Sequence, residues 1–110
     1  MPDDARAAIT MRRATRLPDR LRGLLGRDRM GPYEVLDIDP CASIHTFGMR
    51  FAIDVVFVGS DSRILRIDRA VAPGRMRVCW RSRRVLEMAS GGADRLGLAV
   101  GARWRHGDTR

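Results

Sequence analysis

Hydrophobic positions along the chain follow two periods, one helical and one extended. The four leucines of residues 17–25 recur at intervals of four, three and one residues, which predicts a short amphipathic helix beginning near Pro18 and ending at Gly26. Most of the remaining hydrophobic residues occur in short apolar or alternating runs rich in β-branched side chains, separated by glycine, proline and aspartate. These runs predict strands at 8–15, 33–38, 53–58, 63–71, 84–89 and 102–106, with a helical turn at 93–98.

Many short strands with one or two small helices predict a mostly β fold, a compact jelly-roll-like or barrel-like domain. At 110 residues the chain is expected to form one domain, 1–110, with an ordered core of about 8–106. No run approaches the ~20 apolar residues that a membrane-spanning helix needs. The first residues also lack the apolar region of a signal peptide. We therefore expect a cytoplasmic protein with no membrane partner.

Chemically capable side chains gather where the chain enters the most apolar of these strands. Polar and reactive residues fill 41–50, and the strand 53–58 that follows has a single charge, Asp54. Polar groups at the mouth of an apolar β core are a common binding design. The first hypothesis is therefore a binding or accessory module with a pocket near residues 41–54, which takes a small or anionic ligand. Its candidate ligand-binding residues are His45, Met49, Arg50, Asp54 and Glu87.

A second hypothesis is an enzyme that uses Cys41 and His45 as a nucleophilic pair, with Asp54 as a further catalytic candidate. An imidazolium close to a thiol favours the thiolate, which suits hydrolase or thiol chemistry. Cys41, His45 and Cys79 could also bind zinc, but neither cysteine has a second cysteine close by in sequence. We expect no metal and no cofactor.

The carboxylates of Asp54 and Glu87 each interrupt an apolar strand. If both faced one pocket, they could divide acid and base roles. The ordinary interpretation is that each pairs with an arginine, since buried charges need partners. Arg27, Arg50 and Arg84 are the available partners.

The formal net charge is +8, from 21 basic and 13 acidic residues, which favours an anionic partner. Every basic residue is arginine, and the arginines are spread along the chain. Residues 75–84 contain no acidic residue and surround one tryptophan with arginines. That pattern is typical of phosphate contacts combined with base stacking, although a solvated loop has it too. The candidate nucleic-acid residues are Arg75, Arg77, Trp80 and Arg81.

Three motifs in order resemble an uncharacterised family, domain of unknown function 192. They are Arg20–Arg27, which reads RLRGLLGR, Phe51–Phe57, which reads FAIDVVF, and Val85–Gly91, which reads VLEMASG. The resemblance implies a compact β-rich, jelly-roll-like domain with a small helix, and it implies no assigned activity. The chain departs from the family pattern at Ile44–Met49, where His45 stands at a position usually held by tryptophan.

Overall fold

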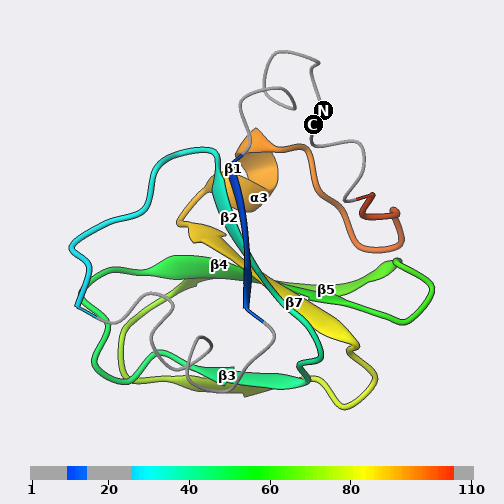
Figure 1. The fold of residues 1–110 in the computed structure, drawn as a ribbon, viewed down its shortest axis with the longest axis horizontal. Coiled ribbons are helices and arrows are strands. Elements are labelled where there is room, and N and C mark those ends of the chain that lie inside the picture. The colour runs from blue at the N-terminus through cyan, green and yellow to red at the C-terminus, as the bar shows by residue number, and fades with distance from the viewer. Residues whose placement is uncertain (1–9, 15–25, 106–110) are drawn as a thin grey trace.

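The computed structural model describes residues 10–14 and 26–105. These residues form two β-sheets and one short helix (Figure 1). The main sheet has five strands in the order β1-β2-β7-β4-β5, and the small sheet pairs β3 with β6. The elements are β1 (Thr10–Ala14), β2 (Glu34–Ile38), β3 (Ser43–His45), β4 (Ile53–Val58), β5 (Ile64–Val71), β6 (Met76–Val78), β7 (Arg84–Ala89) and α3 (Gly92–Arg95).

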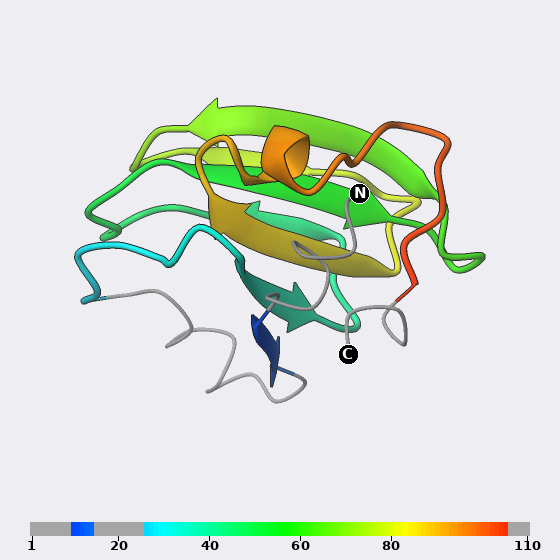
Figure 2. The same cartoon turned by 90° about the horizontal axis from the view of Figure 1, so that it is seen from above.

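The main sheet is antiparallel except at one edge, where β1 runs parallel to β2. Figure 2 shows its strands in order from green β5 to blue β1, with α3 over the sheet. β7, the last of the described strands along the chain, lies at the centre between β2 and β4. The central position of β7 accounts for its apolar run, because a central strand is covered on both faces.

The core consists of two clusters, one on each face of the main sheet. The first cluster lies between the main and small sheets and includes Ile44 of β3 with Val55 and Phe57 of β4. The second cluster lies on the α3 side and includes Val56 of β4 and Trp104. Successive residues of a strand point to opposite faces, so the fully buried β4 contributes to both clusters.

The predicted mostly β fold with a short helix is confirmed, and five of the predicted strands correspond to β1, β2, β4, β5 and β7. The two sheets do not close into a barrel, because the edge strands β1 and β5 do not pair with each other. Instead of a strand at 102–106, the structure has one isolated bridge between Arg63 and Arg103. The helix predicted in 17–25 lies outside the described residues. Within the described ranges, no helix has the length and hydropathy needed to span a membrane.

Candidate functional site

The predicted site residues are divided between the two faces of the main sheet. Ile53 and Val55 belong to the first cluster, so the intervening Asp54 points to the opposite face, toward α3. Cys41 is buried in the first cluster, whereas His45 is exposed on the small sheet. The three side chains therefore do not meet in one pocket.

Asp54 is a buried carboxylate whose partners are backbone amides. Its Oδ1 accepts from Ala70 N at 2.9 Å, and its Oδ2 accepts from Gly91 N at 3.1 Å and Ala93 N at 3.0 Å. Ala70 and Gly91 have left-handed backbone conformations, with φ of 50° and 88°. Three N–H donors stabilise a buried carboxylate as an arginine would. Asp54 therefore joins β4 to β5 and to the start of α3.

The expected arginine partner of Asp54 is wrong, because the three candidate arginines pair with other acids. Arg27 pairs with Glu34, and Arg50 pairs with Asp28 at the surface. Arg84 binds Asp39 at 2.8 Å and approaches Asp37 at 3.5 Å.

Cys41 and His45 have separate local contacts. The Cys41 thiol donates to the carbonyl of Ser43 at 3.0 Å within the buried first cluster. The His45 ring stacks on Phe47 with centroids 5.1 Å apart, and its Nδ1 accepts from Phe47 N at 3.3 Å. In residues 10–14 and 26–105, no three His, Cys, Asp or Glu side chains are grouped as metal ligands.

Because Cys41 is buried, we expect iodoacetamide at neutral pH to modify it slowly. The half-buried Cys79 should react first, and both thiols should react quickly in denaturant. Peptide mass spectrometry over a time course would distinguish the two cysteines. Cys41 alkylation at the rate of the denatured protein would contradict this expectation and favour the nucleophilic pair.

Glu87 is buried in the first cluster. It faces Leu36 of β2 on one side and Val55 of β4 on the other. Its residue surface is 6% exposed, and no group in the described part of the chain donates a hydrogen bond to it. Burial raises the pKa of this carboxyl from 4.5 to about 7. The expected arginine partner of Glu87 is therefore wrong as well.

Two other predicted ligand-binding residues lie near this face of the molecule, but with different environments. Met49 is buried in the first cluster, which the side chain of Glu87 faces, and Phe51 packs against that cluster. Arg50 is exposed and binds Asp28 at 2.9 Å. Of the predicted set, the structure thus brings together Met49 and Glu87.

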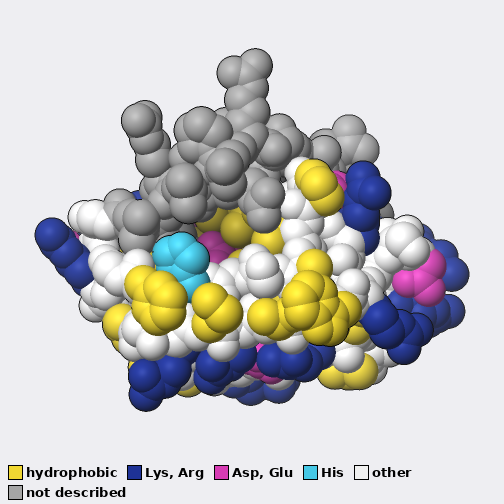
Figure 3. Space-filling model, turned by 90° about the horizontal axis from the view of Figure 1, so that it is seen from below, with side chains coloured by type: hydrophobic (Ala, Val, Ile, Leu, Met, Phe, Trp, Pro, Cys, Tyr) yellow, Lys and Arg dark blue, Asp and Glu magenta, His cyan; other side chains and the backbone are white. Residues whose placement is uncertain are grey.

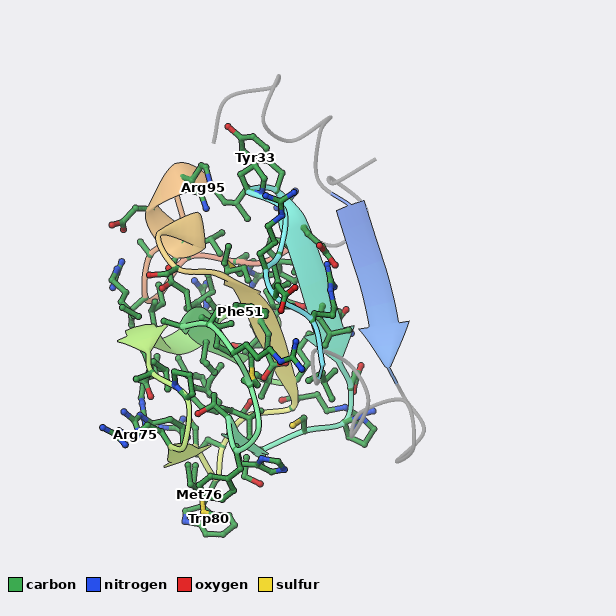
Figure 4. All side chains as sticks on the ribbon, turned by 90° about the vertical axis from the view of Figure 1, so that its left-hand side faces the viewer. Tyr33, Phe51, Arg75, Met76, Trp80 and Arg95 are labelled. Atoms are coloured by element: carbon green, nitrogen blue, oxygen red, sulfur yellow. The ribbon has the colours of Figure 1, made fainter. Side chains whose placement is uncertain are left out.

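The outer surface of the small sheet carries large apolar side chains that face solvent. Phe47, Met76 and Trp80 are 49%, 58% and 86% exposed, and the fourth exposed large hydrophobic residue of the described chain is Val100. Met76 and Val78 are two residues apart along β6, which places them on one face, and Trp80 follows in the turn after the strand, beside Met76 (Figure 4). We call the set His45, Phe47, Met76, Val78 and Trp80 the outer patch.

Figure 4 shows Met76 and Trp80 pointing away from the main sheet. Figure 3 shows hydrophobic side chains in a row beside a histidine, with arginines along the border of this row. Arg75 and Arg81 are exposed, and neither forms an ion pair with a described residue. Arg77 approaches Asp68 at 3.4 Å. The sequence predicted Trp80 and the arginines around it as an interaction site, but not Met76. The even spacing of Met76, Val78 and Trp80 is the signal that could have placed Met76 in the same site.

A polar cleft of about 260 Å³ lies beside the β4–β5 turn. The hydrogen bonds from Arg84 and Arg83 lower the pKa of Asp39 although its burial acts in the opposite direction. The carboxylate of Asp39 binds both arginines of the cleft, Arg83 and Arg84, and offsets part of their positive charge. The cleft therefore has little attraction for a charged ligand. The cleft is lined by Asp39, Gly59, Ser60, Ser62, Arg83 and Arg84.

The sequence matches the model of the DUF192 family, described as "Uncharacterized ACR", over residues 1–106. The chain belongs to this family, as its three motifs suggested. Among curated proteins, none matches this sequence.

Two crystal structures are similar in fold. One is a Sinorhizobium meliloti protein described as a "putative transcription regulator", with a TM-score of 0.78 and 24% identity, covering 86% of this chain and 79% of that one. The other is a protein of unknown function from Novosphingobium aromaticivorans, also with a TM-score of 0.78 and 24% identity, covering 86% and 73%. At this identity the likeness shows a shared fold.

Proposed function

We propose that this domain is a binding module that holds single-stranded nucleic acid on the outer patch. The observation that carries the proposal is the exposure of Trp80, with 86% of its surface in solvent, beside Met76 and Phe47. Contiguous exposed apolar surface of this kind marks an interaction site. Bases stack on exposed aromatic rings with about 1–3 kcal/mol per base, and every base offers such a face.

The dimensions of the outer patch suit more than one base. Met76 and Trp80 are four positions apart in the chain, which can span up to about 13 Å. Stacked bases repeat about every 3.4 Å along a strand. The stacked rings of His45 and Phe47 add a second aromatic platform next to Met76, which pairs with His45 in the small sheet.

The charge beside the outer patch matches a phosphate backbone. Arg75 and Arg81 flank the apolar residues and have no acidic partner among the described residues, so their guanidinium groups are free to contact phosphates. The net charge of +8 adds long-range attraction for a polyanion.

Two further points fit this partner. The similar Sinorhizobium meliloti protein is described as a "putative transcription regulator". A cytoplasmic location, where single-stranded nucleic acid is found, stays a prediction from the sequence.

The proposal is tested with a fluorescein-labelled 12-nucleotide single strand, titrated with protein at 50 and 200 mM salt. We expect anisotropy to rise at low salt and the affinity to fall at high salt, because binding releases counterions. Trp80→Ala should weaken binding by about 5- to 150-fold, the equivalent of one stacked base. Replacing Arg75 and Arg81 together by alanine should reduce the salt slope by about 1.4.

Intrinsic fluorescence gives an independent readout, because Trp104 is 3% exposed and only Trp80 is accessible. Stacking on Trp80 should quench emission, and the Trp80→Ala protein should show no such quenching. Val100→Ala and Arg103→Ala, which change exposed residues outside the outer patch, are matched controls that should bind normally. No binding at 50 mM salt, or equal binding by Trp80→Ala, would refute the proposal. Binding to anionic lipid vesicles but not to the oligonucleotide would refute it in favour of a membrane surface.

A further inference from the structure

We propose that Glu87 is the charged anchor of a second site, which binds a small organic ammonium ion with an apolar body. The site would lie on the face of the main sheet that bears the first cluster. It is separate from the outer patch and does not depend on nucleic-acid binding.

Glu87 lies on β7, the central strand of the main sheet. On β7 it alternates with Leu86 and Met88, which face the second cluster, so its own side chain faces the first cluster. Its direct cross-strand neighbours, Leu36 and Val55, are apolar and buried. The carboxyl is thus held in an apolar environment at the centre of the main sheet.

The carboxyl of Glu87 does not join segments of the fold, in contrast to that of Asp54. Asp54, the other acid of this kind, accepts three backbone N–H groups and joins three segments of the chain. Glu87 accepts no hydrogen bond from a described residue. A buried carboxylate without a partner is costly, and an apolar residue would fill the position with less penalty. An unused buried acid is more typical of a binding site than of a structural position.

A ligand of Glu87 would need to reach the first cluster from the surface. Figure 3 shows a hollow on this side of the molecule, in which an acidic side chain lies among hydrophobic ones. Met30 and Met49 belong to the first cluster, which the Glu87 side chain faces, and Phe51 packs against the same cluster. Methionine side chains adapt easily to an inserted group because they are unbranched and flexible. The described residues therefore supply an apolar wall with one carboxyl.

The charged side chains on this face of the sheet indicate which class of ligand Glu87 would bind. Asp68 lies on the same face beyond Val55, where Arg66 binds it at 2.6 Å and Arg77 approaches at 3.4 Å. Glu34 of β2 is likewise paired with Arg27. Glu87 is thus the acid on this face for which the described residues provide no cation. In an apolar surrounding, a carboxylate gains most from a positive charge that also donates hydrogen bonds, as an ammonium group does.

Apart from these paired acids and arginines, the titratable groups of described residues near the first cluster are two thiols and one imidazole. Cys41 is buried in the cluster, Cys79 packs against it, and His45 is exposed on the small sheet. None of the three is a carboxylate that would compete with Glu87 for an ammonium ion.

The experiment uses benzylammonium as the probe, with benzyl alcohol and benzoate as neutral and anionic analogues. Amide chemical shifts of the ¹⁵N-labelled full chain are followed by NMR at 0.15 M salt, where the net charge is screened. We expect benzylammonium at pH 8 to shift amides of β7 and β4 around Glu87. Benzyl alcohol should bind at least tenfold more weakly, and benzoate should cause no such shifts.

The pH profile gives a signature that a merely apolar pocket would lack. With a carboxyl pKa of about 7, the ionised fraction of Glu87 rises from about a tenth at pH 6 to about nine-tenths at pH 8. Benzylammonium affinity should rise about tenfold over this range. This measurement needs no variant, so it decides the proposal even if substitutions disturb the fold.

Glu87→Gln should abolish the benzylammonium shifts while keeping oligonucleotide binding, and Trp80→Ala should do the reverse. Asp61→Asn, an exposed acid in the β4–β5 turn, is the matched control and should bind the probe normally. The proposal is overturned by absence of shifts at pH 8, by equal binding of benzoate, or by equal binding of the Glu87→Gln protein.

Discussion

Replacing Asp54 with asparagine should lower the free energy of unfolding by about 3 kcal/mol. Asparagine keeps one acceptor oxygen and turns the other into an NH₂ donor. Whichever oxygen is lost, a donor then faces the backbone N–H of Ala70, or those of Gly91 and Ala93. Lost charge-assisted hydrogen bonds and an unsatisfied buried N–H together account for a cost of this size.

Urea denaturation and thermal melting measure this effect, and the melting temperature should fall by more than about 10 °C. Asp28→Asn is the matched control, because Asp28 is exposed and binds only the exposed Arg50 among the described ion pairs. Its change should stay within about 0.5 kcal/mol. An Asp54→Asn protein as stable as the wild type would show that the three backbone contacts are not what holds α3 and β5 to β4.

Glu87→Gln should have the opposite effect and stabilise the protein at alkaline pH. The pKa of Glu87 is about 7 in the folded chain and near 4.5 when exposed, so the folded state binds the proton more tightly. Between these two values the unfolded chain ionises while the folded chain does not, and stability therefore falls as pH rises. The loss attributable to Glu87 between pH 5 and pH 8 is about 2 to 3 kcal/mol.

The measurement is the free energy of unfolding in urea at pH 5, 6, 7 and 8 for the wild type and Glu87→Gln. The difference between the two proteins should grow in favour of the glutamine variant and level off above pH 7. Glu34→Gln is a useful comparison, since that acid is paired with Arg27 and its loss should not stabilise the protein at pH 8. Parallel pH profiles for the wild type and Glu87→Gln would contradict a raised pKa.

Much of the main sheet could be predicted from sequence because its strands carry a local signal. The apolar run 53–58 and its neighbour 63–71 are separated by a turn cluster, and they form the β4–β5 pair. The small sheet has no comparable signal: β3 and β6 are three residues each and lie far apart in the chain. Their pairing depends on tertiary contacts, such as Ile44 in the first cluster, and an alternating pattern cannot develop over three residues.

Some features of the candidate site could likewise be predicted from the sequence, and others could not. The aromatic and basic character of Trp80 and its neighbours is visible in the sequence, and so is the anomaly of an acid in an apolar strand. The partners of Asp54 are not visible, because they are backbone groups from distant turns rather than side chains. Side-chain types predict an arginine partner, and only the fold shows that Ala70 and Gly91 turn their amides toward the carboxylate.

The place of β7 in the main sheet has a consequence for how the chain folds as it is made. β7 is the last of the described strands to leave the ribosome, yet it separates β2 from β4. Until Ala89 has emerged, the nascent chain offers β2 no antiparallel neighbour, and the β4–β5 hairpin alone is marginal in water. The central sheet must therefore assemble after nearly the whole domain has been synthesised, and its high contact order predicts slow folding for a chain of this length.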